Sequence, residues 1–212
     1  MKSFSAICEE IIARQLNVRW FGNARADNLQ DPTFVDRLKR SGCWMLALGI
    51  ETESDETRKD MMKRLESEKI RIALVNMRAS GIKSFGLFIL GYPGEDLKAL
   101  DRTIDYAIRL DPDFANFYPA GPYPGTELYN KAKRDGLVAG EDWTKMEYSF
   151  YLLKGNGLNE QVAMDAINRA KRRFFLRPRY LVRHAGDVLK LAITKWPVAW
   201  HIGSQMLFGR RA

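Results

Sequence analysis

Cysteine is scarce in this sequence, and its scarcity excludes the usual cysteine-based metal sites. Only Cys8 and Cys43 occur among the 212 residues, and their separation matches neither the CxxC nor the CxxxC spacing of a metal or cluster site. The two histidines, His184 and His201, stand alone, so neither is assigned a metal role. Two free thiols fit a reducing compartment, and we predict a cytoplasmic protein.

Long apolar runs are also missing. No stretch of 18 uncharged apolar residues exists, which is about the length that a membrane-spanning helix needs. The opening residues, MKSFSAICEEII, carry two glutamates inside their apolar region, unlike a cleavable secretion signal. We expect neither a membrane-spanning helix nor a secretion signal.

Acidic residues are nearly absent from the last part of the chain, although the rest is balanced. Residues 1–168 contain 23 Lys or Arg and 25 Asp or Glu, whereas residues 169–212 contain 11 and 1. The net charge of +8 therefore belongs to a basic tail. No recognisable nucleic-acid-binding motif accompanies the basic residues, so we predict no nucleic-acid partner.

Short apolar segments alternate with helical patterns through the rest of the chain. Four segments have the composition of strands: Val18–Phe21, Trp44–Ile50, Phe85–Leu90 and Phe114–Tyr118. Helical patterns cover residues 4–16, 31–42, 54–64, 67–81, 95–110 and 125–136. This alternation predicts βα units and a parallel sheet.

The predicted fold class is therefore α/β, with about four βα units. A complete eight-unit barrel needs about 250 residues, so the chain forms either a small α/β sheet or part of a larger barrel. We divide it into residues 1–158, which hold the βα units, and residues 159–212, a helical basic extension.

Ligands of parallel α/β sheets sit at the carboxyl ends of the strands, so the segments after each predicted strand are candidates for a site. These segments are GNARAD, GIETESDE, GYPGED and PAGPYPGTELY, all rich in glycine, proline or polar side chains. Such a composition lets the backbone approach a ligand closely. The alternative is that βα loops use Gly and Pro only as turn residues, which explains one loop more easily than four.

Three motifs in this order resemble the second half of a radical S-adenosylmethionine (SAM) enzyme. They are GCWMLALGIETESDETRKDMMKR, GLFILGYPGED and YPAGPYPGTELY. Trp20 followed by Arg25 matches a further family feature, and the similarity covers roughly residues 5–185. The match is to the cobalamin-binding branch, which includes enzymes similar to the anaerobic magnesium-protoporphyrin cyclase and to those of hopanoid biosynthesis. It implies a partial parallel (β/α) barrel of the radical SAM type.

The resemblance also implies cofactor-binding roles for six residues: Arg25, Glu51, Ser54, Gly91, Gly94 and Tyr118. Arg25 would pair with the SAM carboxylate, because a guanidinium fork suits that geometry. Glu51 and Ser54 would face the ribose or the amino group of SAM. Gly91 and Gly94 would let the backbone approach the adenine, which Tyr118 would flank. No catalytic residue is assigned.

Several of these residues have a structural alternative. Arg25 could instead be an ordinary surface arginine. Glu51 could instead be a carboxylate that complements the dipole of the following helix. Tyr118 has the alternative of a packing residue. Glu95, next to the glycines, is expected to cap the helix that follows it.

The sequence departs from the family where the iron–sulfur cluster should be bound. Radical SAM chemistry uses a [4Fe–4S] cluster held by a CxxxCxxC motif, which is absent here, as is any recognisable cobalamin domain; Thr52 replaces a serine of the family motif. We expect the SAM-orienting half of an enzyme that cleaves SAM reductively to a 5′-deoxyadenosyl radical or performs cobalamin-dependent methyl transfer.

The cluster, and cobalamin in the full-length protein, would be held by a missing N-terminal half or a partner chain. The chain alone would then be inactive. The alternative is a non-catalytic remnant, or an interaction module, that keeps the fold.

The basic tail is predicted to form two or three helices broken at Pro178 and Pro197. One helical face carries Leu189, Ile193, Trp196 and Trp200, flanked by Lys190 and Lys195. A basic stretch with interleaved tryptophan is typical of a helix that lies on anionic lipid. We expect a small-molecule or lipid-like substrate, and peripheral membrane contact would suit a lipid-like one. The alternative is that the tail packs on the barrel or on a missing domain.

Overall fold

The structure, a computed structural model, describes residues 2–140 and 153–186. The chain forms two compact units. Unit 1 consists of residues 1–89 and 105–118, and unit 2 of residues 90–104 and 119–212. Each unit therefore combines segments that are distant in the sequence. The division into residues 1–158 and 159–212 stays a prediction.

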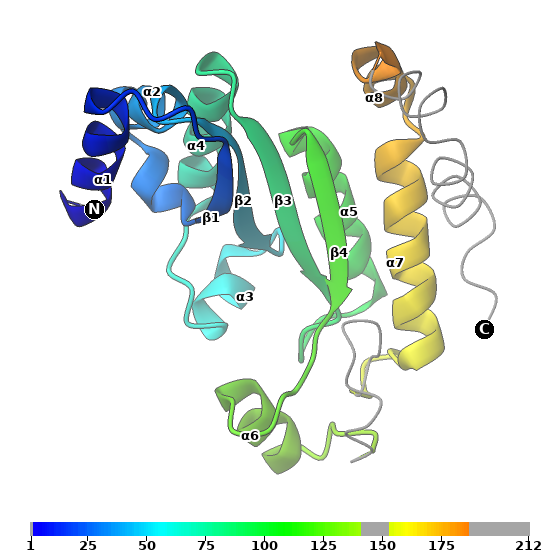
Figure 1. The fold of residues 1–212 in the computed structure, drawn as a ribbon. Coiled ribbons are helices and arrows are strands. Elements are labelled where there is room, and N and C mark those ends of the chain that lie inside the picture. The colour runs from blue at the N-terminus through cyan, green and yellow to red at the C-terminus, as the bar shows by residue number, and fades with distance from the viewer. Residues whose placement is uncertain (1, 141–152, 187–212) are drawn as a thin grey trace. The chain divides into compact units, whose positions relative to one another are not determined.

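Unit 1 is built on a four-stranded parallel sheet (Figure 1). The strands follow their sequence order across the sheet: β1 (Trp20–Ala24), β2 (Cys43–Glu51), β3 (Lys83–Leu90) and β4 (Phe114–Pro119). The last residue of β3 and of β4 belongs to unit 2. The prediction of an α/β fold with four parallel strands is confirmed.

The predicted boundaries of the first strand are wrong, because β1 begins at Trp20 rather than Val18 and continues to Ala24. The backbone N–H of Trp20 donates to the carbonyl of Gly42 at 3.1 Å, and its indole N–H donates to the carbonyl of Ser41 at 2.9 Å. The pairing with the turn before β2 thus starts at Trp20. Asn23, which the composition assigned to a loop, is a strand residue.

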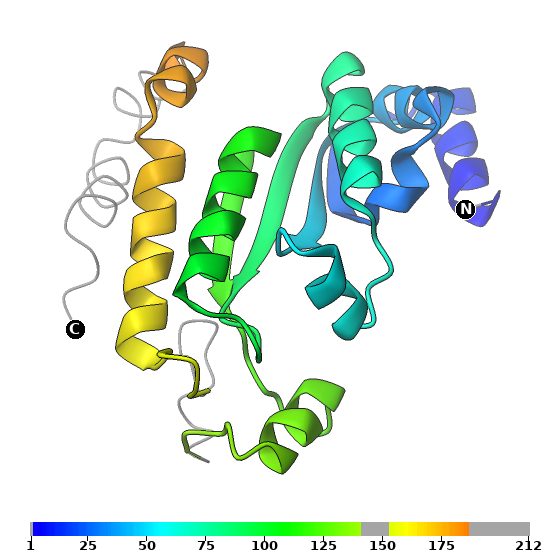
Figure 2. The same cartoon turned by 180° about the vertical axis from the view of Figure 1, so that it is seen from behind.

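Helices cover one face of this sheet, as Figures 1 and 2 show for α4 from opposite sides. The helices before α4 are α1 (Lys2–Ala13), α2 (Pro32–Arg40) and α3 (Asp55–Asp60), and α4 itself spans Ser67–Ala79. α2 begins where predicted, because the Asp31 carboxylate accepts a hydrogen bond from the backbone N–H of Thr33 at 2.9 Å and proline occupies the first helical position. α4 buries Ile70, Leu74 and Met77, as its helical pattern predicts.

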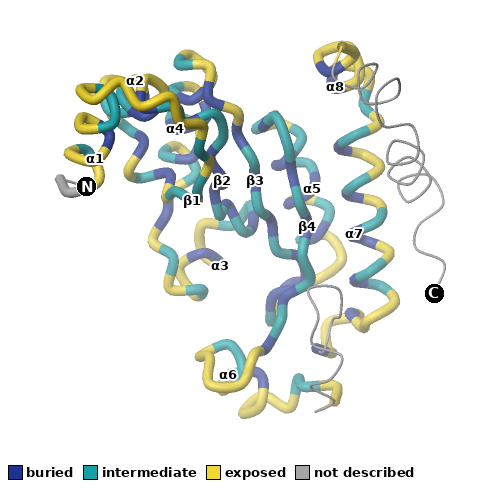
Figure 3. The backbone as a smooth tube through the Cα atoms, viewed as in Figure 1, coloured by how far each residue is buried: buried dark blue, intermediate teal, exposed yellow. Residues whose placement is uncertain are grey.

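The opposite face of the sheet, turned toward the viewer in Figure 1, carries no helix among the described residues of unit 1. Along β1, Phe21 and Asn23 are exposed, whereas the residues that alternate with them are half-buried. Most of β2 and β3 is buried or half-buried (Figure 3). The uncovered face is therefore most accessible at β1, which is an edge strand.

α3 is shorter than the predicted helix over residues 54–64, because it ends at Asp60. Met62 has a left-handed backbone with a φ of 57°. Its N–H donates to the carbonyl of Lys59 at 2.9 Å, and the N–H of Lys63 donates to that of Arg58 at 2.8 Å. These two bonds form a Schellman motif, which ends a helix and turns the chain sharply. From Lys63 onward the chain therefore no longer follows the axis of α3.

The amino ends of β3 and β4 are joined through Asp113. Its carboxylate accepts hydrogen bonds from the backbone N–H of Ser84, from the Ser84 hydroxyl and from Nζ of Lys83, each at 3.0 Å. Burial raises the pKa of this carboxyl, but the hydrogen bonds from Ser84 and Lys83 lower it further, so the net pKa is below the usual value. The carboxylate is thus held in its charged form.

Unit 2 is largely helical. α5 (Leu97–Leu110) begins in it and ends in unit 1, and its other helices are α6 (Glu127–Arg134), α7 (Glu160–Phe175) and α8 (Pro178–Arg183). Arg169 of α7 forms an ion pair with Asp101 of α5 at 3.0 Å. The predicted helix break at Pro178 is confirmed, because Pro178 is the first residue of α8.

The tail beyond α8 was predicted to break again at Pro197 and to carry an apolar face with tryptophans. These residues, and His201, lie outside the described part of the chain. His184, the other histidine, is buried and its ring lies 4.3 Å from that of Tyr180. In the described residues, no helix is long and apolar enough to span a membrane.

Candidate functional site

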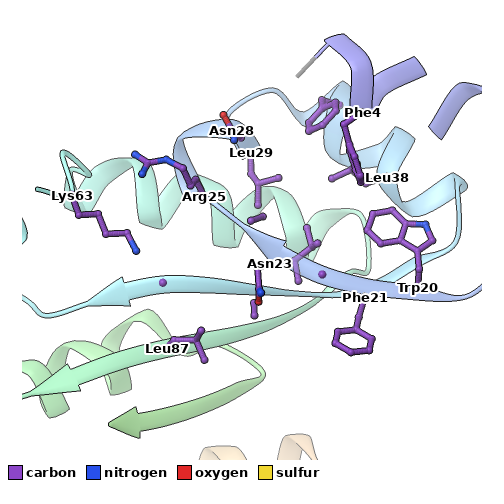
Figure 4. A pocket seen from close by; sticks show the side chains of 16 residues that line it. Phe4, Trp20, Phe21, Asn23, Arg25, Asn28, Leu29, Leu38, Lys63 and Leu87 are labelled. Atoms are coloured by element: carbon purple, nitrogen blue, oxygen red, sulfur yellow. The ribbon is translucent and has the colours of Figure 1, made fainter. Parts of the chain in front are cut away.

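The carboxyl ends of β1 and β2 border a pocket of about 620 Å³ in unit 1. In Figure 4, Arg25 and Lys63 lie at one end of this pocket, whereas Phe4, Trp20 and Leu38 lie at the other. The two cations are thus on the side toward which β2 runs. A pocket at this edge is where a parallel sheet is expected to bind its ligand.

Arg25 follows β1 directly and forms a two-pronged ion pair with Asp27. Its Nη2 donates to Oδ2 of Asp27 at 2.8 Å, and its Nε donates to Oδ1 at 3.1 Å. The hydrogen bond from Arg25 lowers the pKa of the Asp27 carboxyl, and the same bond raises the pKa of the guanidinium. A guanidinium has five N–H donors, so Arg25 retains donors for a second carboxylate.

Two side-chain amides anchor the loop that carries Arg25 to α4. It forms a short 3₁₀-helix, η1 (Ala26–Leu29). Nδ2 of Asn76, on α4, donates to the carbonyl of Leu29 at 2.8 Å, and Nε2 of Gln30 donates to the carbonyl of Lys69 at 2.9 Å. The loop is therefore tied to α4, which holds Arg25 at the pocket.

Glu51, the last residue of β2, has an unusual backbone. The pairing with β3 matches Gly49 to Leu87 and Glu51 to Phe88, so Ile50 is an extra residue that forms a bulge. Glu51 itself has a φ of 69°, in the left-handed region that costs a residue with a side chain about 1–2 kcal/mol. Strain of this kind is common where a side chain is aimed at a ligand.

The Glu51 carboxylate forms an ion pair with Nζ of Lys63, and both side chains are largely buried, with 17% and 19% exposed. The pair lies over Gly49. A Cβ atom built on Gly49 would lie 2.6 Å from Oε1 of Glu51 and closer still to Nζ of Lys63. Lys63 lines the pocket together with Gly49 and Arg25. Glu51 itself is not among the lining residues and reaches the pocket only through its partner Lys63. The predicted contacts of Arg25 and Glu51 with SAM stay predictions.

Ser54 and Tyr118 do not line this pocket, although both are among the described residues. The Ser54 hydroxyl accepts a hydrogen bond from the backbone N–H of Thr57 at 3.1 Å and caps α3. Tyr118 is a half-buried residue of β4. Their predicted contacts with SAM stay predictions.

The glycine loop after β3 belongs to unit 2. Gly91 and Gly94 have φ values of 81° and 94°, which only glycine adopts readily. A Cβ on Gly94 would meet nothing within 4 Å, so the turn itself requires that glycine. The predicted approach of an adenine to both glycines stays a prediction.

The expected role of Glu95 as a cap of the next helix is wrong. Its carboxylate accepts hydrogen bonds from the backbone N–H groups of Gly91 and Tyr92 at 3.0 and 3.1 Å. Asp96 instead accepts from the N–H of Ala99 at 2.8 Å, at the start of α5. Glu95 thus shapes the glycine loop, because a buried carboxylate needs donors and two strand-end amides supply them.

Lys63 is the site residue that sequence reasoning missed. It lies 12 positions after Glu51, near the end of the first quoted motif and in a stretch predicted to be helical, and none of the roles that the resemblance implies was assigned to it. Only the turn at Met62 brings it back over β2.

The residues of this chain do not fit an iron–sulfur cluster. Cys8 and Cys43, its only cysteines, are free and buried. Burial raises the pKa of the Cys43 thiol to about 12, whereas a cluster ligand is a thiolate. No group of three or more acidic, histidine or cysteine side chains in the described residues is arranged to hold a metal ion.

Comparison with protein families decides what kind of protein this site belongs to. The model of the radical SAM superfamily matches residues 2–107. The chain belongs to the radical SAM superfamily. Its members use SAM and a [4Fe–4S] cluster, so these two cofactors are confirmed for the family.

Curated relatives within this superfamily include methyltransferases and cyclases. An uncharacterized methyltransferase of Pyrococcus horikoshii is 28% identical over 182 residues, which are 84% of this chain and 39% of that protein. The anaerobic magnesium-protoporphyrin IX monomethyl ester cyclase of Rubrivivax gelatinosus is 28% identical over 182 residues, 85% of this chain and 32% of that protein. The chain thus spans between about a third and two fifths of the length of these relatives.

Solved structures of radical SAM enzymes share the fold. Coproporphyrinogen III oxidase from Escherichia coli aligns with a TM-score of 0.57 at 14% identity, over 81% of this chain and 37% of that chain. The methyltransferase TsrM from Kitasatospora setae, solved with cobalamin and a [4Fe–4S] cluster, aligns with a TM-score of 0.55 at 19% identity, over 76% and 33%. The resemblance to this family's barrel is therefore confirmed at the level of fold.

Proposed function

We propose that this chain is the SAM-orienting part of a radical SAM enzyme that cleaves SAM reductively or performs cobalamin-dependent methyl transfer. The observation that carries the proposal is the pocket at the carboxyl ends of β1 and β2, with Arg25 and Lys63 at one end and Glu51 paired to Lys63. SAM carries a carboxylate, an ammonium group and ribose hydroxyls, and this end of the pocket offers the complementary charges.

Each side chain then has one task in binding. Arg25 donates to the SAM carboxylate through the N–H groups that Asp27 leaves available, because guanidinium and carboxylate match as two-pronged partners. Glu51 accepts hydrogen bonds from the SAM amino group or ribose. The apolar end of the pocket, near Trp20 and Leu38, excludes water from the bound molecule.

The cluster ligands come from sequence outside residues 1–212, either in a longer protein or in a partner chain. The absence of a CxxxCxxC motif from the sequence supports this. The edge strand β1 supports it too, because Phe21 is 67% exposed there and an unpaired strand edge is a ready site for a further strand. The chain alone is then inactive in SAM cleavage.

The experiment has two steps. Isothermal titration of the chain with SAM, compared with Arg25→Gln, measures binding, and we expect the variant to bind more weakly. Anaerobic reconstitution with iron and sulfide then follows, for the chain alone and with the polypeptide encoded directly upstream. We expect 5′-deoxyadenosine or methyl transfer only in the mixture; no SAM binding in any preparation overturns the proposal.

A second candidate is a non-catalytic remnant or interaction module. It shares with the first candidate the observation that both cysteines are buried and neither is available for cluster chemistry. This candidate predicts neither iron uptake nor SAM cleavage with an upstream partner.

The proposal also includes a substrate class and a role for the basic tail. We expect a small-molecule or lipid-like substrate. Among the relatives, one is named as a methyltransferase and another as a cyclase of magnesium-protoporphyrin IX monomethyl ester. Contact of the basic tail with a membrane surface, no nucleic-acid partner, and cobalamin in the full-length protein are proposed on the sequence alone. Flotation of the chain with anionic vesicles tests the membrane contact.

A further inference from the structure

We propose that Lys63 is a positioning residue that holds the Glu51 carboxylate in place for SAM. This inference rests on the proposed function, because it assumes that Glu51 accepts hydrogen bonds from SAM. It gives a role to a residue of the first quoted motif to which the resemblance assigned none.

The end of α3 places Lys63 by backbone geometry. The N–H of Lys63 donates to the carbonyl of Arg58, and the preceding Met62 takes a left-handed conformation. Arg58 is fully buried, and its Nε donates to the carbonyl of Leu65 at 2.8 Å while Nη2 donates to the Ser67 hydroxyl at 2.7 Å. Hydrogen bonds thus tie the segment after the turn to Arg58 of α3 before it. The backbone that carries the Lys63 side chain is therefore fixed by the fold.

Gly49 provides the space in which the two side chains meet. Its φ does not lie in the left-handed region, so no turn requires glycine there. A side chain on Gly49 would instead collide with both Glu51 and Lys63. Glycine is therefore needed at position 49 to leave room for the ion pair, and not to permit a particular backbone conformation.

The strained backbone of Glu51 has a purpose in this arrangement. The bulge at Ile50 and the left-handed conformation of Glu51 turn its carboxylate back over the strand, where Lys63 meets it. A carboxylate has about four acceptor positions and an ammonium group three donors. Glu51 can therefore stay paired to Lys63 and still accept a hydrogen bond from a ligand in the pocket.

The test measures SAM affinity by titration in five variants of the full chain, with the upstream polypeptide present if the wild-type chain needs it. We expect Lys63→Gln to raise the Kd of SAM about tenfold, since residues that orient a contacting group are worth about 10–100-fold. Gly49→Ala should produce a similar loss by displacing the pair. Lys59→Gln is the matched control, because it removes one positive charge from an exposed position on α3, the helix that precedes Lys63.

A double-mutant cycle separates positioning from a merely structural role. If Lys63 acts through Glu51, then Glu51→Gln with Lys63→Gln should bind SAM no more weakly than Glu51→Gln alone. Titration with 5′-methylthioadenosine, which lacks the amino-acid part of SAM, locates the contact. A loss in Lys63→Gln for both ligands places Glu51 at the ribose, and a loss for SAM alone places it at the amino group.

The outcomes distinguish this inference from the proposed function. Wild-type affinity for SAM in Lys63→Gln and in Gly49→Ala, or additive losses in the cycle, overturns the role of Lys63 and leaves the proposed function intact. No SAM binding by the wild-type protein overturns both. If Lys63→Gln does not fold, as circular dichroism would show, Gly49→Ala decides the question.

Discussion

The two ends of the sheet in unit 1 use the same pair of chemical groups in different ways. At the amino end, the Asp113 carboxylate accepts three hydrogen bonds, one from Lys83 and two from Ser84. At the carboxyl end, the Glu51 carboxylate accepts from Lys63 alone, as far as the described residues show. The backbone is ordinary at Asp113, whereas it is left-handed at Glu51.

This is the difference that the proposed function expects between an ion pair that only stabilises the fold and one that also serves a ligand. Asp113 uses three of about four acceptor positions within its own chain, whereas Glu51 uses one for Lys63 and keeps more of them for a further donor. A left-handed backbone at a residue with a side chain is common at ligand sites, although Asp111, near the amino end of β4, also has one, with a φ of 51°. The structure therefore predicts that substitutions at the amino end lower stability, and that those at the carboxyl end lower ligand affinity.

The largest contrast is expected between two glycines near the ends of β2. Gly42 has a φ of 98°, and a Cβ there would lie 3.1 Å from the carbonyl carbon of Val18 and closer to its oxygen. Because backbone cannot move aside as a side chain can, Gly42→Ala should lower the free energy of unfolding by about 3 kcal/mol. Gly49→Ala should lower it by under about 1 kcal/mol. Equal losses in urea denaturation would contradict the contrast.

Loss of one carboxylate should have a smaller effect that again differs between the ends. Asp113→Asn leaves the donors of Ser84 and Lys83 without their charged partner and should lower the free energy of unfolding by about 2 kcal/mol. Glu51→Gln should lower it by under about 1 kcal/mol, because a single ion pair is lost. The comparison uses the urea midpoints of both variants, and a larger loss for Glu51→Gln would argue against it.

The stability of the amino end should also depend on pH. The pKa of Asp113 is lower in the folded chain than its usual value, so the unfolded state binds a proton first as the pH falls. Its contribution is fully present above the usual carboxyl pKa and is lost as the pH falls through the folded value. The difference in stability between wild type and Asp113→Asn should therefore shrink on acidification; a constant difference would show that its charge is unimportant.

The smallest expected change is a gain in stability at the carboxyl end. Met62 is 79% exposed and left-handed with a φ of 57°, a position of the Schellman motif that glycine prefers. Met62→Gly should raise the free energy of unfolding by about 0.5–1 kcal/mol, because glycine takes this conformation without strain. Thermal denaturation measures the gain, and a lower midpoint would show that the Met62 side chain contributes contacts of its own.

The fold was largely predictable from local patterns. Apolar strands and helical periodicity identify β2, β3 and β4 to within two residues at their boundaries, and Asp31 and Pro32 mark the start of α2. β1 was misplaced because its partner, the turn before β2, lies 20 residues further along the chain. Pairing between distant segments is not a local property, so composition alone could not locate it.

The candidate site was predictable in part. Arg25 follows β1 and Glu51 ends β2, and the carboxyl ends of adjacent parallel strands meet at one edge of a sheet. The sequence by itself determined these two positions, because they follow from the order of strands and from motifs. It also determined that this chain lacks the three cysteines of a cluster site.

Only the tertiary structure decided how Glu51 is held. The left-handed turn at Met62 ends α3 four residues before the predicted boundary. After this turn the chain comes back toward the end of β2, where Lys63 pairs with Glu51, 12 residues before it in the sequence. A Schellman turn without glycine has no clear signature in the sequence, because its hydrogen bonds are between backbone groups. Whether a lysine after such a turn meets a carboxylate depends on the space above Gly49, which exists only when the strand and the turn are packed together.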